Sequence, residues 1–253
     1  MPFVTYEKKD HVVTITLNRP ERMNALGAEL RNQLIEADTR FAEDDDAWVA
    51  VYTGAGEKAF CVGLDLKEAA ERGSRQERIL PSRFTPHIEH SKPTIAAING
   101  YAYGGGLEMA LRCDVRICSD NAILALAEVK RGLCPPSGSF TLPRLIGVSN
   151  AMWWLMSGEP IDAKEALRIG LVTKVMPFSE LLSGATKMAE TICRNAPLAV
   201  RATKQLVKLG LEVSMHYGFK LGLGTMDAVW GSEDAVEGSR AFAEKRQPVW
   251  KLR

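Results

Sequence analysis

The sequence predicts an α/β fold followed by a helical C-terminal region. In the first half of the chain, short apolar segments alternate with segments of helical periodicity, a pattern typical of a mostly parallel sheet. A run of three glycines, Gly104-Gly105-Gly106, stands between an apolar segment and a helical one. From about Val148 onward the periodicity is mainly helical.

The first half of the chain supplies the expected strands. Val13, Ile15 and Leu17 alternate with other residues and so share one face of a strand. A helix is expected over residues 26–41, where apolar residues recur at helical spacing. The acidic run at residues 43–46 ends that helix and is expected to be a solvated loop. Four further short apolar segments are expected to be strands: residues 48–53, 94–98, 115–118 and 123–126.

The second half is expected to hold helices at residues 162–170, 179–194 (capped by Ser179), 197–211 and 213–230, a last helix from Ser232, and one strand at residues 171–175. This layout divides the chain into residues 1–195, the α/β core with the active site, and residues 196–253, a helical oligomerisation region.

Residues 71–83 carry four arginines and are the most loop-like segment. They form either a mobile cover over a site or a solvated helix and loop, and the second interpretation is slightly favoured.

Composition narrows the class of protein. Of 253 residues, 46% are hydrophobic and 25% are charged, which is ordinary for a soluble globular protein. The net charge of +1 gives no electrostatic reason to expect a nucleic acid or a membrane as partner. The sequence shows neither a membrane-spanning apolar stretch nor the pattern of a secretory signal. Five cysteines without a CxxC pair are interpreted as buried free thiols, which indicates the reducing cytoplasm.

The three glycines are a candidate functional loop. Their N–H groups lie at the start of a helix, where the backbone can come close to a ligand and negative charge is favoured. A phosphate cradle is not supported, because neither GxxxxGK[ST] nor GxGxxG is present. An oxyanion hole needs a second N–H, which the turn around Gly63 can supply. Tight packing of strand against helix explains the glycines equally well.

Two glutamates are candidate acid–base groups. Glu108 lies in the first turn of the helix that follows the glycines, and Glu128 follows an apolar strand. Stabilisation of the helix dipole and simple solvation are the alternative explanations. Near an oxyanion hole, the two carboxyl groups can instead divide acid and base work. His87 and His90 are three residues apart, but no third ligand stands near them, so no metal site is expected.

The chain resembles the enoyl-CoA hydratase/isomerase (crotonase) superfamily over nearly its whole length. The resemblance is carried by FCVGLDL at residues 60–66, by KPTIAAINGYAYGGGLE at residues 92–108, and by the closing stretch at residues 232–246, which is also similar to carnitinyl-CoA dehydratases. It implies a crotonase-like spiral of ββα units with a helical C-terminal trimerisation region. A homotrimer or a dimer of trimers is therefore expected.

The resemblance also implies a reaction. The backbone N–H groups of Val62 and Gly105 would bind the thioester oxygen, and Glu108 and Glu128 would add water across the α,β double bond of a trans-2-enoyl-CoA. The presence of both glutamates favours a hydratase over an isomerase. Coenzyme A would be part of the substrate, with no separate cofactor. The alternatives are an enoyl-CoA isomerase, a carnitinyl-CoA-type dehydratase and a non-catalytic acyl-CoA binder.

Further contacts and one departure follow from the same resemblance. The implied substrate and CoA contacts are Arg22, Ala25, Leu64, Phe242 and Lys245. Where this chain has Pro136, hydratases of the family often have a glycine whose N–H helps to hold the catalytic water. Proline has no N–H. The loop therefore departs from the family pattern at the point where water is positioned.

Overall fold

The computed structural model describes residues 1–71 and 90–253. A six-stranded sheet has the order β1-β2-β3-β5-β7-β10, and only the β1–β2 pair is antiparallel. A smaller sheet has the order β4-β6-β8-β9. The strands are β1 (Val4–Lys9), β2 (Val12–Leu17), β3 (Val49–Gly54), β4 (Ala59–Cys61), β5 (Thr94–Ile98), β6 (Tyr101–Tyr103), β7 (Val115–Ser119), β8 (Ile123–Ala125), β9 (Ile161–Asp162) and β10 (Lys174–Met176).

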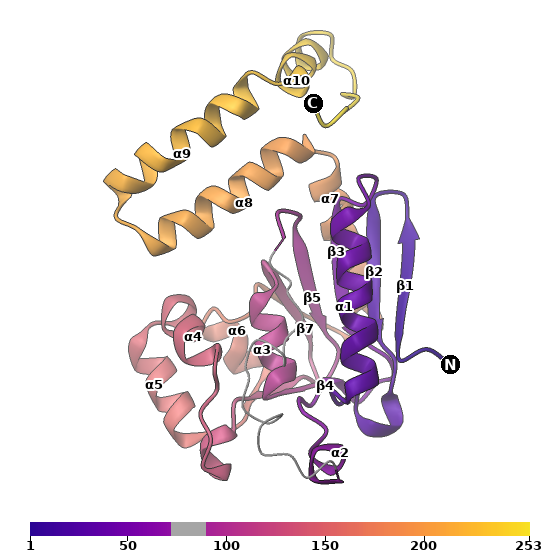
Figure 1. The fold of residues 1–253 in the computed structure, drawn as a ribbon, viewed down its shortest axis with the longest axis vertical. Helices are drawn as coiled ribbons and strands as arrows, with labels where there is room; N and C mark the ends of the chain where they lie inside the picture. Colours follow the sequence, from indigo (N-terminus) through magenta and orange to yellow (C-terminus); the bar gives the residue numbers. More distant parts are fainter. Residues whose placement is uncertain (72–89) are drawn as a thin grey trace.

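The chain winds as a spiral in which each turn adds one strand to each sheet. β3, β5 and β7 enter the large sheet, and β4, β6 and β8, which directly follow them, enter the small one. A helix then returns the chain, which confirms the expected ββα units (Figure 1). The helices are α1 (Ala28–Glu43), α2 (Leu66–Glu71), α3 (Gly105–Arg112), α4 (Gly138–Ile146), α5 (Val148–Ser157), α6 (Ala163–Arg168), α7 (Phe178–Cys193), α8 (Pro197–Glu212), α9 (Met215–Trp230) and α10 (Glu233–Ala243), with 3-10 turns η1 (Pro20–Arg22) and η3 (Glu128–Arg131).

The large sheet is buried on both faces. Ile95 and Ala97 of β5 belong to a core cluster with residues of α7, whereas Ala96 and Ile98 of the same strand belong to the cluster that includes α1. A strand covered on both faces has no polar face, which explains why the central strands read as continuous apolar segments.

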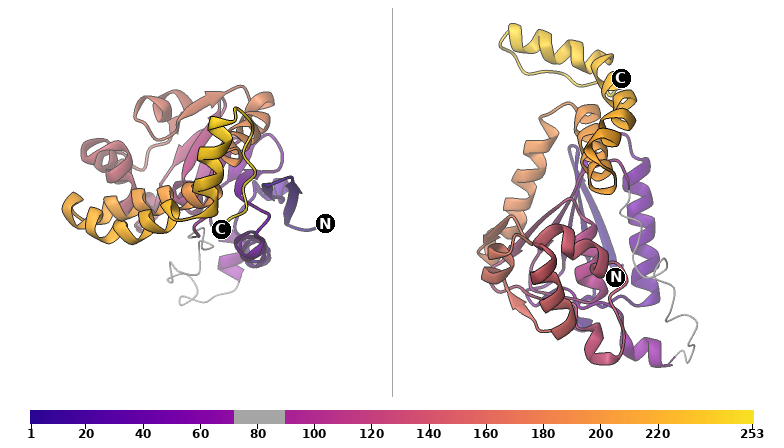
Figure 2. Two further views of the ribbon diagram at one scale, coloured as in Figure 1. Left: turned by 90° about the horizontal axis from the view of Figure 1, so that it is seen from above. Right: turned by 90° about the vertical axis from the view of Figure 1, so that its left-hand side faces the viewer.

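The C-terminal helices extend away from the spiral. α8 and α9 form an antiparallel hairpin, and α10 follows α9 at the end of the hairpin opposite the α8–α9 connection (Figures 1 and 2). The closing tail returns to the core, where Trp250 and Leu252 pack against the cluster beneath α7. Large side chains on α9, among them Phe219 and Leu223, remain exposed.

Several expected boundaries were wrong. The helical region starts at Gly138, ahead of Val148, because α4 contains Pro143, which disguises a helix in sequence. α7 begins at Phe178 with Pro177 as its N-cap, so Ser179 does not cap it. The strand expected at residues 171–175 is the shorter, later β10.

One expectation about surface residues is confirmed and one changes. The acidic run at residues 43–46 forms the largely exposed end of α1 and the loop after it, where Lys8 Nζ lies 2.9 Å from Asp44 Oδ2 and 3.0 Å from Asp46 Oδ2. All five cysteines are free thiols, but Cys134 is exposed and Cys193 is only half-buried. Apart from Glu71, the segment at residues 71–83 lies outside the described residues, and so does His87.

No described helix combines the length and the apolar character needed to cross a membrane.

Candidate active site

Three parallel strands of the small sheet end side by side, and each is followed by a candidate site residue. β6 pairs in parallel with both β4 and β8. Leu64 follows β4, Gly105 follows β6 and Glu128 follows β8. Because the carboxyl ends of parallel strands meet at one edge of a sheet, segments that are far apart in sequence converge there.

Glu108 is buried between two helices. It lies in the first turn of α3 and its residue surface is only 3% exposed. Its Oε1 accepts hydrogen bonds from the N–H groups of Ser137 (2.8 Å) and Gly138 (3.0 Å). Gly138 is the first residue of α4, so these donors belong to a helix N-terminus, which favours a negative charge. The two N–H donors fix the orientation of the Glu108 carboxyl group.

Glu128 has a different environment. It opens η3 and is half-buried, and its Oε2 has no hydrogen-bond partner among the described residues. Burial raises the pKa of Glu128, and the charge of Glu108 raises it further, whereas its own backbone N–H and Arg131 lower it. The two carboxyl groups therefore interact electrostatically while their hydrogen-bond partners and burial differ. Such a difference in environment allows one carboxyl group to act as a base and the other as an acid.

The three glycines serve both packing and the site. A Cβ on Gly106 would lie 2.1 Å from Cys61 O, so this glycine is required for α3 to pack against β4. Gly104 has φ +50°, and a Cβ there would lie 3.2 Å from Glu128 Oε1. Gly105 is the first residue of α3, so its N–H has no acceptor within the helix. Packing therefore explains Gly106, while Gly105 keeps a free N–H of the kind that an oxyanion hole would need.

The turn around Gly63 contacts the glycine loop directly. A Cβ on Gly63 would lie 2.9 Å from Gly105 N and 2.8 Å from Tyr103 O. The turn that was expected to supply a second N–H is therefore beside the first.

The hydrogen bonds of this turn do not fit the role expected of Val62. Its N–H donates to Met23 O at 3.3 Å, so it is engaged within the protein. In the next residues, Leu26 N–H donates to Gly63 O (2.7 Å) and Asp65 N–H donates to Leu26 O (3.4 Å). Adjacent N–H groups of an extended segment point in opposite directions, so the N–H of Leu64 points away from Leu26. Within the described part of the chain it has no acceptor.

The structure separates the expected CoA contacts into two groups. Arg22 is exposed at the end of η1, and Ala25 and Leu64 lie close to it through the η1 turn and the Leu26–Leu64 bridge. Phe242, 88% exposed on α10, and Lys245 lie at the opposite end of the molecule from α2, which begins directly after Asp65 (Figures 1 and 2). A single chain does not bring the two groups together.

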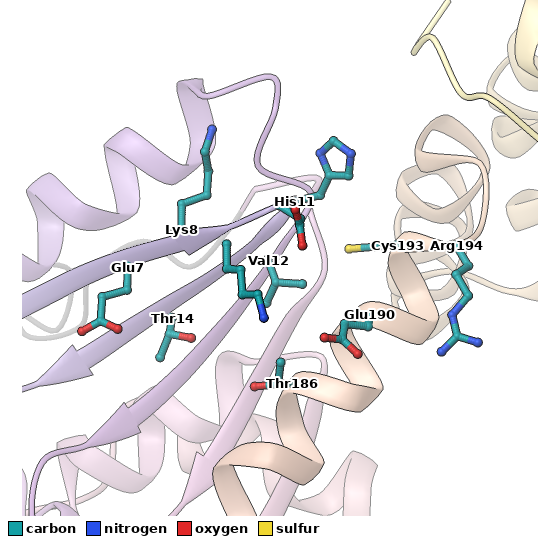
Figure 3. A pocket seen from close by; sticks show the side chains of 11 residues that line it. Glu7, Lys8, His11, Val12, Thr14, Thr186, Glu190, Cys193 and Arg194 are labelled. Atoms are coloured by element: carbon teal, nitrogen blue, oxygen red, sulfur yellow. The ribbon is translucent and has the colours of Figure 1, made fainter.

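A cavity elsewhere on the protein is not a candidate for the reaction site. It measures about 460 Å³ and lies between the β1–β2 turn and the end of α7 (Figure 3). Figure 3 shows Glu7, Lys8, Glu190 and Arg194 around it, and neither candidate glutamate lines it. It adjoins the first residue of β2, at the end of the large sheet where the parallel strands begin. Among the described residues, no group of three or more His, Cys, Asp or Glu side chains is placed to hold a metal ion.

Comparison with known proteins agrees with this geometry. A family model described as enoyl-CoA hydratase/isomerase matches residues 7–253. The chain is 45% identical to (E)-benzylidenesuccinyl-CoA hydratase of Thauera aromatica, with 98% of each chain covered. It is 43% identical to carnitinyl-CoA dehydratase of Proteus mirabilis, covering 96% of this chain and 95% of that protein. The solved structure of an enoyl-CoA hydratase from Bacillus anthracis matches with a TM-score of 0.94 at 38% identity, covering 99% of this chain and 100% of the other.

Proposed function

Because this chain belongs to the enoyl-CoA hydratase/isomerase family, we propose that it is a hydro-lyase that adds water reversibly to the α,β double bond of a trans-2-enoyl-CoA. The observation that carries the proposal is the pair Glu108 and Glu128. One carboxyl group is held by two backbone N–H donors, and the other is half-buried with a raised pKa. Hydration requires one base for the water and one acid for the carbon, and this pair meets both requirements.

The thioester oxygen is bound by the N–H groups of Leu64 and Gly105 in this proposal. Both are free of acceptors in the described part of the chain, and the turns that carry them are in contact. Attack of water at Cβ moves an electron pair through Cα onto the thioester oxygen, giving an enolate. Backbone donors already aimed at that oxygen stabilise the charge as it develops, and in other enzymes loss of one such donor costs about 10²–10³ in rate.

The two glutamates handle the protons. Glu108 accepts a proton from the attacking water, whose oxygen forms the new bond to Cβ. Glu128, whose raised pKa favours its protonated form, gives its proton to Cα as the enolate collapses. The two groups exchange protonation states in each cycle, and exchange with solvent restores them after the product leaves.

Loss of the enoyl-thioester absorbance measures the proposed reaction. Glu108→Gln and Glu128→Gln keep the side-chain shape but remove proton transfer, so each should lower kcat by about 10²–10⁴. Glu159→Gln, at an exposed glutamate paired with Lys130, is the control and should retain full activity. Hydration at the normal rate by either active-site variant would contradict the paired mechanism.

The alternatives predict different results in the same assays. An isomerase would shift the double bond without losing it and would depend strongly on only one glutamate. A non-catalytic binder would retain an acyl-CoA without turnover. A panel of crotonyl-CoA, longer enoyl-CoA esters, (E)-benzylidenesuccinyl-CoA and carnitinyl-CoA, the last assayed for dehydration, identifies the acyl group.

Assembly completes the CoA site in this proposal. Phe242 and Lys245 lie far from Leu64 in their own chain, so they would contact CoA bound to a neighbouring subunit of a homotrimer or a dimer of trimers. A lysine there would act as a point charge on phosphate, and the phenylalanine would pack against adenine. The free thiols fit the reducing conditions of the cytoplasm.

A further inference from the structure

The peptide group between Gly63 and Leu64 determines where one of the proposed oxyanion donors points. Its carbonyl oxygen, Gly63 O, accepts the N–H of Leu26 at 2.7 Å. Because the C=O and N–H of a trans peptide group point in opposite directions, this hydrogen bond directs the Leu64 N–H away from Leu26. Gly63 has φ +82°, and glycine has no side chain to limit rotation there. The orientation of this peptide group therefore also depends on how the next residue is held.

Asp65 follows this peptide group and is held by both of its carboxylate oxygens. It is buried, and its N–H donates to Leu26 O at 3.4 Å. Its Oδ1 accepts the N–H groups of Lys67 (3.1 Å) and Glu68 (3.2 Å), and its Oδ2 lies 2.9 Å from Arg19 Nη1. Burial raises the pKa of Asp65, but these hydrogen bonds and the charge of Arg19 outweigh burial and hold the pKa below its usual value. The carboxylate is therefore charged at neutral pH.

Arg19 comes from a different part of the chain and is itself restrained. It lies directly before η1, and its side chain is 16% exposed. Its N–H donates to Asn24 Oδ1 at 2.9 Å, and its guanidinium lies over the ring of Phe3. The guanidinium also lies close to the start of α1, where a Cβ on Gly27 would be 2.7 Å from Arg19 Nη1. The ion pair with Asp65 therefore joins the turn to η1 and to the N-terminus of α1.

We propose that the Arg19–Asp65 ion pair positions the Leu64 N–H for the developing oxyanion. This inference rests on the proposed function, in which Leu64 supplies one of the two donors. Arg19 and Asp65 are positioning residues in this scheme, because they act on the thioester only through the peptide group that carries the Leu64 N–H. A donor stabilises an oxyanion best when its direction is fixed before the charge develops. Loss of the ion pair should therefore weaken transition-state stabilisation more than substrate binding.

Arg19→Met tests the inference, with Arg168→Met as the matched control. Methionine keeps an unbranched side chain next to Phe3 but cannot pair with Asp65. Arg19→Met should lower kcat for hydration by about 10- to 100-fold with little change in KM, because a group displaced by about 1 Å loses much of its catalytic effect. Arg168→Met also removes an ion pair, with Glu165, but on the exposed surface of α6, and it should match the unmodified protein.

Two further variants keep the proposal testable if Arg19→Met folds poorly. Arg19→Lys retains a positive charge near Asp65 and should be more active than Arg19→Met. Asp65→Asn retains the Oδ1 acceptor for the N–H groups at the start of α2 but loses the charge that pairs with Arg19, so it should lower kcat as Arg19→Met does. Circular dichroism identifies the variants that fold, and rates are compared among those.

A spectroscopic measurement separates the oxyanion donors from the acid–base step. Butyryl-CoA labelled with ¹³C at the thioester carbonyl has no double bond to hydrate, and hydrogen bonds to its carbonyl oxygen lower the infrared stretching frequency. The unmodified protein and Arg168→Met should lower this frequency equally at saturating ligand. Arg19→Met should give a smaller shift, which a loss of stability alone would not produce in the folded fraction.

Different results contradict different parts of this scheme. Normal kcat in Arg19→Met, an undiminished carbonyl shift in that variant, or an equal loss in Arg168→Met would overturn the positioning role. No shift in the unmodified protein bound to butyryl-CoA would exclude the oxyanion donors and this inference with them. A shift without hydration of any substrate in the panel would overturn the proposed reaction, and the comparison of shifts would still test the ion pair.

Discussion

Asp38 is a buried carboxyl group that serves the fold rather than the proposed reaction. It lies on α1 with 5% of its surface exposed, and Tyr52 O–H donates to its Oδ1. Its Oδ2 has no partner among the described residues. Burial raises the pKa of Asp38 to about 7, although the hydrogen bond from Tyr52 lowers it. The folded protein therefore retains a proton on Asp38 at pH values where the unfolded chain has lost it.

This proton links stability to pH. Between about pH 4 and pH 7 the folded state binds more protons at Asp38 than the unfolded state, so its contribution to the free energy of unfolding falls as pH rises. Asp38→Asn keeps an acceptor for Tyr52 without a charge and should remove this fall. The variant should gain stability relative to the unmodified protein from pH 4 to pH 8, by about 1.4 kcal/mol for each pKa unit of the shift. Denaturant unfolding at both pH values measures the gain, and the exposed Asp227→Asn is the control. A gain that does not depend on pH would contradict the assignment.

Glu128 should set the alkaline limb of the pH profile. Hydration needs it protonated, so kcat/KM should fall as pH rises through its raised pKa, which lies above 4.5. Arg131 lowers that pKa, so Arg131→Met should move the limb to higher pH. Lys130→Met removes a neighbouring cation that is paired with Glu159 and should leave the limb in place. Identical limbs in all three proteins would rule out Glu128 as the titrating acid.

At the residue scale, the sequence indicates which candidate side chains come close together better than it indicates which backbone N–H groups stay free. Glu108 and Glu128 stand in recognisable segments, and the structure brings their charges within interaction range. Val62 N–H donates to Met23 O, whereas Leu64 N–H has no acceptor among the described residues. This difference depends on the contacts with Met23 and Leu26, nearly forty residues earlier, and a single sequence does not reveal it.

At the element scale, buried strands could be predicted and α4 could not. The central strands are apolar throughout because both faces of the large sheet are covered. α4 starts with a glycine and contains Pro143, so propensity argues against it, yet its N-terminus holds Glu108. Tertiary contacts therefore decide this helix, and the proposed site depends on it.

The end of α1 depends on a buried lysine. Lys92, 3% exposed, donates from Nζ to Phe41 O (2.7 Å) and Asp44 O (2.6 Å), two carbonyl groups at the C-terminus of the helix. Lys92→Met keeps the length of the side chain but removes the donor to both carbonyls, and Asp44 O retains only the hydrogen bond from Ala47 N–H (2.9 Å). It should lower the free energy of unfolding by about 1–3 kcal/mol, measured as a shift of the denaturant midpoint. Lys9→Met, at an exposed lysine, should not move the midpoint. Equal midpoints for the two variants would show that the buried contacts add nothing.

At the scale of the whole molecule, the described residues include exposed apolar side chains on several helices. One group lies on α9, and another lies on α4 and α5, where Phe140, Met152 and Trp153 are exposed. Exposed apolar patches on this scale mark interaction surfaces. Because the two surfaces differ, contact between the first on one copy and the second on another would be heterologous and can close into a ring.

Assembly should therefore depend on α9. Light scattering at micromolar concentration should give at least three times the 27.8 kDa mass of one chain. The double variant Phe219→Glu/Leu223→Glu places charges on one face of α9 and should shift the protein toward monomer. Lys220→Glu, between these positions, is a control of similar charge change that should leave the assembly intact. A stable monomer for the unmodified protein would exclude this mode of association.

The parallel ends of β4, β6 and β8 also bear on how such a protein diverges. Each strand end delivers a different part of the proposed chemistry: an oxyanion donor from the first, a donor and the base from the second, and the acid from the third. The small sheet fixes where these parts stand, and each part lies on a separate loop. A substitution in one loop can therefore alter one part of the proposed chemistry while the strand ends keep the other parts in place. Proteins that share this fold can thus evolve new reactions through changes in single loops while they continue to act on thioester substrates.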